Sequence, residues 1–550
     1  QEVPYQCAPP TNTSDFLIPE LHNDWLNTSV HYGKCTITVT ANASGDVRTT
    51  EYSCVYGMQY KRPEDASIVS EFDLVCGRSS LAALTQTLLS LGSGLGSVVC
   101  PTLSDLFGRK RVLVISQSLM FVASLVAGLA PNYIVFLVVK GVSLTAITAG
   151  LELFPSTHRF LANGFWETLW WAICLASLAL LAYLLRFESW RVLQLSTCGA
   201  AALVVVMIVV LHEPLQWLIA NNKEAEAEII IQKAAKMNRK DVMKVLDAFH
   251  GLKSEQKGRE NKALDTTDLA ETAEGTDTTT DNTRENGDTT DSDKYDRTMG
   301  IKENVHDEEK LGFKKMFTHR RLRTNILVSW FIWFVDNWVY NALYLMSSQL
   351  AGSLHLNFFL NAAVEGASCI MILLLLERLG RKKLIAVFHF VAGLSLVASG
   401  VCFNFQDTYT SLKIVGTIFS LCGKMGISGS FNTIYLYTPE IFPTNIRNRA
   451  LGTSMAVSTV GAMIAPFTDS LADYGIWITG VVFGLCSLLA MLLLLLLPES
   501  KGRDLPQTVK DLESWYDDPS KAERDVESTT KAPAADDYFK REQYSDSTRL

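Results

Sequence analysis

The stretch Asp105-Leu-Phe-Gly-Arg-Lys-Arg111 has a second copy far along the chain, Glu377-Arg-Leu-Gly-Arg-Lys-Lys383. Each copy follows a long apolar segment and places an acidic residue, a glycine and a basic cluster in the same order. Two further motif pairs recur at a similar offset, namely Glu152–Arg159 with Glu440–Arg447, and His212–Pro214 with Pro498–Ser500. Repetition of three motifs in one order indicates that the chain consists of two related halves.

The composition indicates a membrane protein. Of 550 residues, 48% are hydrophobic and 19% are charged, and the net charge of -8 comes from charges gathered outside the apolar segments. The stretch Ile476–Leu497 carries no charge and reaches the length of about 20 apolar residues that crosses a hydrocarbon core. These features exclude an ordinary soluble enzyme.

The hydropathy pattern predicts about eleven membrane spans. The first group lies at 81–104, 112–130, 133–151, 160–185 and 192–211, and the second at 325–346, 357–376, 384–403, 412–437, 451–471 and 476–497. Because the halves are related, we expect equal numbers of spans in each, and so a first span upstream of Gln1 that is missing from this chain. The expected class is an all-α multi-pass membrane protein with two six-helix bundles.

Basic residues in short loops predict the orientation, because Lys and Arg near span ends favour the cytoplasm. Those on one side are Arg109, Lys110, Arg111, Arg159, Arg320, Arg321, Arg323, Arg378, Arg381, Lys382, Lys383, Arg447, Arg449, Lys501 and Arg503. The short loops of the other side have little beyond Arg186, Arg191 and Lys413. The pattern predicts an extracellular segment Gln1–Cys76 and a cytoplasmic tail after Pro498.

The outer segment carries signs of an oxidising compartment. Three glycosylation sequons begin at Asn12, Asn27 and Asn42. Four of the 11 cysteines also lie there, at Cys7, Cys35, Cys54 and Cys76. An even number of cysteines in this setting predicts two disulfides, with three pairings open.

We expect five regions: an extracellular loop at 1–80, a first bundle at 81–212, a cytoplasmic linker at 213–323, a second bundle at 324–497 and a cytoplasmic tail at 498–550. Within the linker, residues 212–250 have apolar residues at helical spacing, which predicts helices beneath the membrane. Residues 253–299 lack Val, Ile, Phe and Trp and are rich in Thr, Asp and Glu, which predicts disorder.

Several motifs together resemble the major facilitator superfamily, and within it the organic cation, anion and zwitterion transporters of solute carrier family 22. They are the D-x-x-G-R-K loop at Asp105–Lys110, the large cysteine-bearing loop, Ala182-Tyr183 with Trp190-Arg191, Glu213–Leu218, Leu356–Phe359, Tyr437–Pro443, and Pro498–Gly502 followed by Leu505-Pro506. The resemblance covers nearly all of the chain outside the linker and the tail. It implies the major facilitator fold and transport by alternating access.

The resemblance also implies a role in gating for the repeated motifs, whose charges would hold the cytoplasmic side shut and switch partners as the bundles rock. The residues concerned are Asp105, Gly108, Arg109, Glu152, Arg159, Glu213, Glu377, Gly380, Arg381, Glu440, Arg447 and Glu499. The alternative is that the basic residues only fix the topology.

Ionisable residues inside spans cost about 2.5–3.5 kcal/mol each on the insertion scale and mark candidate functional sites. Here they are Lys140, Glu167, Asp336, Glu365 and Lys424. By resemblance, Glu365 matches the family's acidic position in its eighth span, and Lys424 matches its basic position in the tenth. Lys140 stands where the superfamily carries a basic residue, with a structural role as the alternative.

One helical face of the first span after the linker carries Trp333, Asp336, Tyr340 and Tyr344, so aromatic rings would flank a carboxylate. Such a group suits an organic cation, although aromatic stripes in membrane helices also serve packing. Thr459 stands where the family's cation carriers tend to have Asp and its anion or zwitterion carriers Arg.

Two central acids and no Arg in any span favour organic cations, moved by the membrane potential. The alternatives are an organic anion or zwitterion (carnitine-like) transporter, a sugar porter, and a non-transporting sensor or scaffold on the same fold. Pro498–Gly502 also resembles sugar porters, whereas the cysteine-bearing loop and the intramembrane charges disfavour them.

We expect no enzyme activity, no cofactor, no metal site and no nucleic-acid partner, because no nucleophile elbow, metal-ligand spacing or nucleotide loop occurs on a soluble region. The expected partners are a small organic ion, the lipid bilayer and a PDZ-domain protein that would bind the ending Ser547-Thr548-Arg549-Leu550. The expected location is the plasma membrane.

Overall fold

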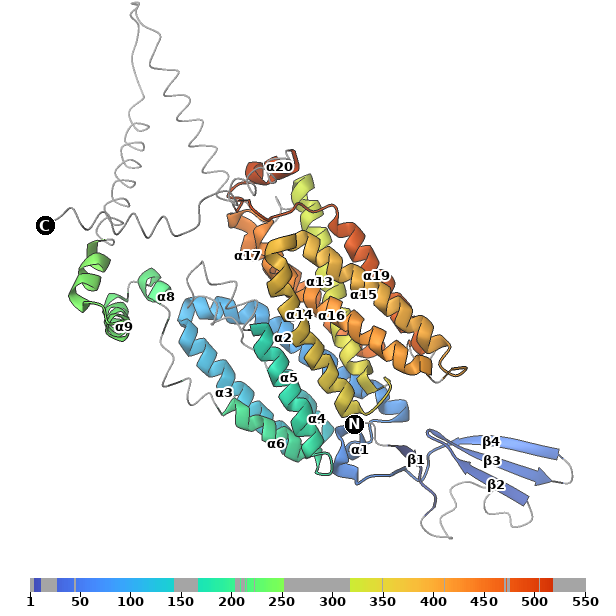
Figure 1. Ribbon diagram of the computed structural model, residues 1–550. Coiled ribbons are helices and arrows are strands. Elements are labelled where there is room, and N and C mark those ends of the chain that lie inside the picture. Colours follow the sequence, from blue (N-terminus) through green and yellow to red (C-terminus); the bar gives the residue numbers. More distant parts are fainter. Residues whose placement is uncertain are drawn as a thin grey trace, which may run out of the picture. The chain divides into compact units, whose positions relative to one another are not determined.

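The computed structural model is mostly helical, with a small strand-rich segment near its beginning (Figure 1). The chain forms two compact units, one of residues 1–101, 115–205 and 311–550 and the other of residues 102–114 and 206–310. The structure describes residues 4–10, 27–43, 46–142, 167–202, 208, 213, 215–221, 223–251, 317–348, 350–409, 411–468, 471, 475–503 and 505–517.

The segment Gln1–Cys76, which the sequence predicts to lie outside and which is here called the outer segment, contains antiparallel strands that the expected all-α class did not include. Strands β2 (Asn27–Tyr32), β3 (Thr36–Ala43) and β4 (Asp46–Ser53) form one sheet in the order β2-β3-β4, and β1 (Tyr5–Cys7) pairs with β5 (Met58–Tyr60). The alternating, β-branched sequence of β3 explains this, since Ile37 and Val39 point to one face and are buried with Cys7.

Two disulfides join this small segment, Cys7 to Cys54 and Cys35 to Cys76. The prediction of two bridges is confirmed, and the structure has one of the three pairings that the sequence left open. A sheet with so few buried side chains gains much of its stability from such cross-links.

As far as the structure describes the first half, a helix overlaps each of its five predicted spans. They are α2 (Ser79–Phe107), α3 (Arg109–Gly128), α4 (Tyr133–Val142), α5 (Glu167–Leu184) and α6 (Trp190–Ala201). At the beginning of α6, Arg191 binds Glu71 of the short helix α1 (Ile68–Glu71) at 2.5 Å and donates to the carbonyl oxygens of Gly128 and Ala130 at 2.9 and 2.8 Å. Trp190 also donates to Glu71. This cluster fastens the outer segment to α3 and α6.

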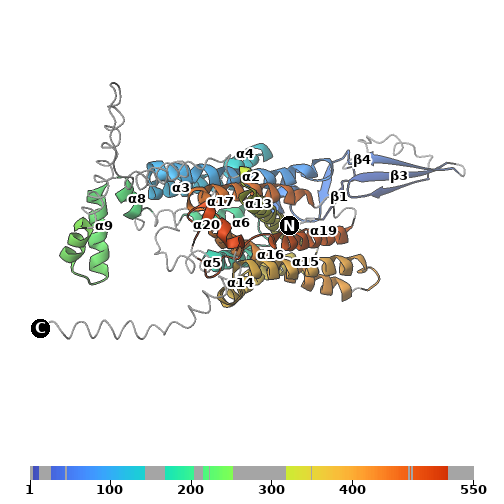
Figure 2. The same ribbon diagram turned by 90° about the horizontal axis from the view of Figure 1, so that it is seen from above.

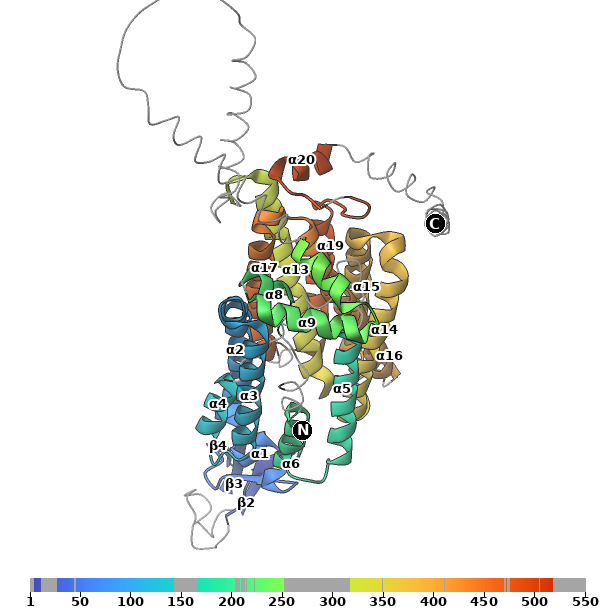
Figure 3. The same cartoon turned by 90° about the vertical axis from the view of Figure 1, so that its left-hand side faces the viewer.

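The second half forms one bundle of helices lying side by side in Figure 1, Figure 2 and Figure 3. Its members are α13 (Arg320–Leu345), α14 (Leu354–Leu379), α15 (Arg381–Asn404), α16 (Ser411–Glu440), α17 (Thr444–Ile464) and α19 (Ile476–Leu494), followed by α20 (Val509–Asp517). Glycines let neighbouring backbones approach closely. A Cβ on Gly426 would lie 2.6 Å from the Phe388 carbonyl oxygen, and one on Gly480 would lie 2.9 Å from the Gly400 Cα.

Six helices among the described residues are long and apolar enough to cross a membrane. They lie at Lys110–Gly128, Leu354–Leu379, Arg381–Asn404, Ser411–Glu440, Ile446–Thr468 and Trp477–Leu494. Helix α13 is as long as α14 but carries Trp, Asn and Asp side chains along its length, which lowers its mean hydropathy. These polar side chains make α13 a candidate location of a functional site.

The second compact unit contains the helices predicted after His212. They are α8 (Leu215–Ala220) and α9 (Glu224–Met237), whose apolar side chains Trp217, Leu218 and Ala227 are buried together. The acidic stretch 253–299, for which the sequence predicts disorder, lies outside the described residues.

Candidate functional site

A buried pair of opposite charges lies between three helices of the second half. Lys424 projects from α16, and its Nζ lies 3.6 Å from Oε1 of Glu365 on α14. The same ammonium donates to the Tyr340 carbonyl oxygen on α13 at 3.0 Å, and Ser428 donates to Glu365 Oε1 at 3.3 Å. Both charged side chains are almost wholly buried, so each charge depends on the other for compensation.

Aromatic rings enclose the ammonium. Lys424 Nζ lies 3.2 Å from the centroid of the Tyr340 ring and 3.7 Å from that of Tyr344. These rings are one helical turn apart on α13, with centroids separated by 5.3 Å. From α5, Trp171 donates its indole N–H to the Tyr340 hydroxyl at 3.0 Å. The site thus receives side chains from both halves of the chain and has the chemistry of an ammonium-binding cage.

The cage has unused hydrogen-bonding capacity. Oε2 of Glu365 and the Tyr344 hydroxyl are buried, and neither makes a hydrogen bond of good geometry within the described residues. Buried polar atoms are nearly always paired in a folded protein. A carboxylate oxygen and a hydroxyl without a well-formed hydrogen bond are therefore candidate contacts for a ligand.

Asp336 lies apart from this cage, which differs from the expectation that Tyr340 and Tyr344 flank its carboxylate. Ser430 of α16 donates to Asp336 Oδ2 at 2.9 Å, and His389 Nε2 of α15 lies 3.6 Å from Asp336 Oδ1. The helical spacing was sound, but the neighbouring helices decide which group each side chain meets. Lys424, and not a free cavity, fills the space between the two rings.

Two other predicted substrate residues have packing partners. Trp333 donates to the Thr438 hydroxyl at 2.9 Å and lies against the Tyr435 ring, with the centroids 4.4 Å apart. Thr459 donates to the Met455 carbonyl oxygen on its own helix. A Cβ on Gly94 would lie 2.5 Å from the Thr459 methyl carbon, so Thr459 packs where α2 contacts α17. Lys140 donates to Gln194 at 3.1 Å, in line with the structural alternative.

The repeated motifs form the same local structure twice. Gly380 has a φ of +86°, and beyond it Glu499 accepts the backbone N–H groups of Arg381 and Lys382 at 3.1 and 3.4 Å. In the other unit, Gly108 has a φ of +103°, and Glu213 accepts the N–H groups of Lys110 and Arg111 at 3.0 and 3.4 Å. Each glutamate therefore binds the positive N-terminal end of a helix, α15 or α3.

A second contact extends the copy in the C-terminal half. Arg381 Nε lies 3.2 Å from Oε2 of Glu440, which also accepts the Ser500 hydroxyl at 2.6 Å. Arg447 donates to the Phe442 carbonyl oxygen at 3.3 Å, and Glu377 is exposed. Glu440 thus pairs with an arginine of its own half in this state of the protein.

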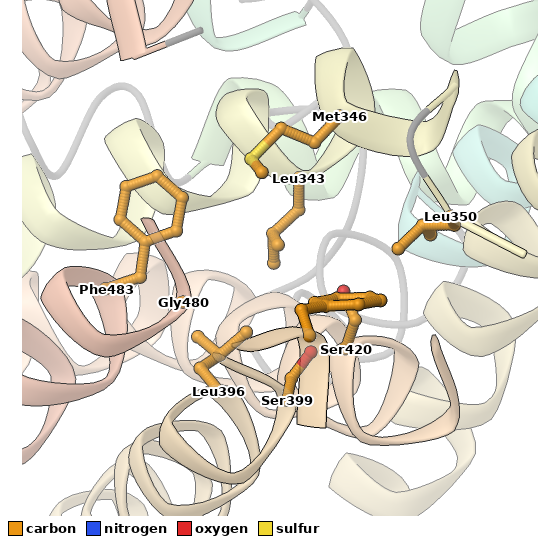
Figure 4. A pocket seen from close by; sticks show the side chains of 9 residues that line it. Leu343, Met346, Leu350, Leu396, Ser399, Ser420, Gly480 and Phe483 are labelled. Carbon is orange, nitrogen blue, oxygen red and sulfur yellow. The ribbon is translucent and has the colours of Figure 1, made fainter. Parts of the chain in front are cut away.

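A small cavity lies in the same bundle but away from the cage (Figure 4). Its volume is about 20 Å³, which is room for about one water molecule. The lining residues are Leu343, Met346, Leu350, Leu396, Ser399, Phe403, Ser420, Gly480 and Phe483. It is too small and too apolar for an organic ion.

Some predicted residues cannot be placed. Asn12, Glu152, Arg159 and the ending Ser547–Leu550 lie outside the described residues. For a second group the backbone is described but the side chain is not, namely Asn27, Asn42, Asp105 and Arg109.

Sequence reasoning missed four members of these clusters, Trp171, His389, Ser428 and Ser430. His389 is an ionisable residue inside an apolar span, so the rule that found Asp336 applies to it as well. Ser428 and Ser430 gave no such signal, since serine is common in membrane helices. Only the fold shows that they face Glu365 and Asp336.

Comparison with known proteins agrees with this architecture. The Major Facilitator Superfamily profile matches residues 77–466. The "Organic cation transporter protein" of Drosophila melanogaster is 30% identical over 473 residues, covering 84% of this chain and 77% of that protein. "Solute carrier family 22 member 2" of Mus musculus is 29% identical over 484 residues, covering 86% of this chain and 76% of that protein. The inward-open xylose transporter XylE from E. coli has a TM-score of 0.53 at 16% identity, covering 80% of this chain and 89% of that chain.

The chain belongs to the major facilitator superfamily and, within it, to solute carrier family 22. It is a multi-pass membrane transporter and not an enzyme. The similarity to the xylose transporter concerns the fold alone.

Proposed function

We propose that this transporter carries small organic cations by alternating access, with Glu365 as the counter-charge and Tyr340 and Tyr344 as the aromatic walls of the substrate site. The observation that supports this most is the position of Lys424, whose ammonium already lies between the two rings beside a buried carboxylate. A site that holds an alkylammonium of the protein has the chemistry to hold one from a substrate. Transport of an organic cation also agrees with the similarity to the organic cation transporter protein of Drosophila melanogaster.

Substrate binding would displace Lys424 from the cage. The incoming cation would take the place of Nζ against the rings and contact the unpaired Oε2 of Glu365. Trp171, reaching Tyr340 from α5, would close the site from the other half of the chain. Asp336 would hold α13 in position and would not touch the substrate.

The repeated cytoplasmic motifs would act as gates. Glu499 and Glu213 fix the N-terminal ends of α15 and α3, and the pair Arg381–Glu440 would open when the halves rock. Asp105, Arg109, Glu152 and Arg159 would form the corresponding gate of the first half, as the repeat implies.

The membrane potential would suffice to drive accumulation. One positive charge gains about 2.3 kcal/mol per 100 mV, or about 1.4 kcal/mol at roughly 60 mV, which is close to a tenfold gradient. Depolarisation is therefore expected to slow uptake.

The test is uptake of radiolabelled tetraethylammonium by proteoliposomes that contain the full chain. We expect saturable uptake that rises with an inside-negative potential and falls at least tenfold in Glu365→Gln. Asp407→Asn, which neutralises an exposed acid outside the cage, serves as the matched control and should behave as the wild type. Potential-independent uptake that prefers an anion and survives Glu365→Gln would refute the proposal, and absence of flux for any solute would favour a sensor or scaffold.

A zwitterion is the second candidate, because Glu365 and Lys424 together present one negative and one positive charge. A carnitine-like substrate would place its ammonium at Glu365 and its carboxylate at Lys424, without leaving a charge unpaired. In that case Lys424→Gln should abolish carnitine uptake and spare tetraethylammonium uptake. Equal loss of both would exclude this candidate.

We also propose that the protein resides in the plasma membrane, with the strand-rich segment outside and the C-terminus in the cytoplasm. Support comes from the sequons, the two disulfides and the basic loops. Glycosidase treatment of the cell-surface protein should shift its electrophoretic mobility, and joint replacement of Asn12, Asn27 and Asn42 should remove that shift. A shift that persists would place a glycan elsewhere.

The C-terminal sequence Ser547-Thr548-Arg549-Leu550 would bind a PDZ domain through its terminal carboxylate and the apolar Leu550 side chain. Deletion of Leu550 is expected to lower surface retention in polarised cells. An unchanged distribution would argue against a PDZ partner.

A further inference from the structure

A second polar cluster is buried between α13, α15 and α16 and has no role in the cage. Asp336, Ser430 and His389 are fully buried, each with a relative exposure of 0%. The Ser430 hydroxyl lies 2.9 Å from Asp336 Oδ2 and 2.9 Å from His389 Nε2. Asp336 Oδ1 and His389 Nδ1 are buried without a hydrogen-bond partner among the described residues. A serine thus connects two ionisable side chains inside a membrane bundle.

The cluster is not neutralised by its surroundings. On the helices packed around it, Glu365 of α14 and Lys424 of α16 compensate each other. Helix α17 carries only Arg447 and Arg449, near its beginning, and α19 carries no charge. With Asp336 ionised and His389 neutral, the cluster would bear one uncompensated negative charge in the membrane interior.

One added proton removes that charge without losing a hydrogen bond. In the ionised state His389 Nε2–H donates to Ser430, and Ser430 donates to Asp336 Oδ2. In the protonated state the Asp336 carboxylic acid donates to Ser430, Ser430 donates to His389 Nε2, and His389 carries its proton on Nδ1. The cluster gains one proton from water and its charge goes from minus one to zero.

The packing divides the cluster between two groups of helices. Helix α15 packs along α16 through glycines, since a Cβ on Gly429 would lie 2.6 Å from the Phe388 ring, next to His389. His389 and Ser430 therefore stay together. Asp336 lies on α13, which packs along α17, so a movement of α13 against α15 and α16 would separate the carboxylate from its partners and admit water.

The same movement would alter the cage. Tyr340 follows Asp336 by one turn of α13, and its carbonyl oxygen accepts the Lys424 ammonium. Ser428 and Ser430 lie two residues apart on α16 and donate to Glu365 and Asp336 respectively. Proton occupancy and the geometry of the cage thus depend on one helix contact.

We propose that Asp336, Ser430 and His389 form a proton-binding site that is loaded when α13 closes against α15 and α16, so that the conformational change of the transporter is linked to proton binding. This goes beyond the proposed function, because it concerns a proton and not the organic substrate. Since the assembled cluster binds one more proton than the separated one, low pH favours the closed arrangement.

The first test measures tetraethylammonium uptake by proteoliposomes at equal pH on both sides and clamped potential. Because the charge of this probe does not change with pH, any pH dependence belongs to the protein. We expect wild-type uptake to fall as pH rises, by at most about tenfold per pH unit for one proton. Asp336→Asn and His389→Gln should flatten the profile. Ser420→Ala, which removes a buried hydroxyl elsewhere on α16, should keep it.

The second test does not need transport. Infrared difference spectra of the purified full chain, recorded between low and high pH, should contain the band of a buried protonated carboxyl. Asp336→Asn should remove this band and Glu365→Gln should retain it. A flat wild-type uptake profile, or a spectrum with no band that depends on Asp336, would overturn the proton site. Absence of all solute flux with the band intact would instead refute the proposed transport function and leave the proton site standing.

Discussion

The buried pair Glu365–Lys424 allows a quantitative test of what each charge contributes. Lys424→Gln leaves the Glu365 carboxylate in the bundle with the Ser428 hydroxyl as its hydrogen-bond donor. Breaking one side of a buried ion pair costs about 3–5 kcal/mol, because the remaining charge stays desolvated. At about 2 °C per kcal/mol for a domain of this size, the apparent melting temperature should fall by about 6–10 °C. Glu365→Gln should cost a similar amount.

The double variant Glu365→Gln with Lys424→Gln separates the charge effect from packing. Both amides are neutral and close in size to the originals, and they can bond to each other, so we expect the double variant to recover most of the loss. Thermal unfolding in detergent, followed by scanning fluorimetry, measures all four proteins. Additive losses in the double variant would refute the pairing and the reasoning built on it. Uptake should stay low in the double variant, because substrate binding needs the carboxylate.

Three further predictions concern regions outside the cage. Glu499→Ala removes the acceptor at the N-terminal end of α15 and should lower stability by about 1–2 kcal/mol, measured as a lower melting temperature. Joint replacement of Cys35 and Cys76 by Ser should destabilise the outer segment by about 2–5 kcal/mol and expose it to proteolysis. The backbone N–H of Thr508 donates to Asp511 in the first turn of α20 and lowers the pKa of that carboxyl. The ionised Asp511 therefore stabilises α20 above the unfolded pKa of about 3.9, and this stabilisation is lost as pH falls further. Amide protection of α20 should decrease below about pH 4, and the decrease should be smaller in Asp511→Asn.

Much of the fold could be predicted from local pattern, because apolar runs of spanning length determine where helices cross a bilayer. The repeat was equally informative. Gly108 and Gly380 both adopt positive φ, and both lie against the glutamate of the third repeated motif, Glu213 or Glu499. The strands of the outer segment were not predicted, because a search for apolar runs of spanning length does not detect short alternating stretches such as that around Ile37.

The candidate site was predicted less well, for a reason that Asp336 illustrates. Helical periodicity places Asp336, Tyr340 and Tyr344 on one side of α13, but that side meets two different neighbours along its length. At the level of the tyrosines it faces Glu365 and Lys424, and one turn earlier it faces Ser430 and His389. A period of 3.6 residues defines a direction around the helix and carries no information about which helix lies there. The partners of a buried charge in a bundle therefore depend on how the neighbouring helices pack and not on the helix that carries the charge. For Asp336 they depend on the glycine contacts that fix α15 on α16.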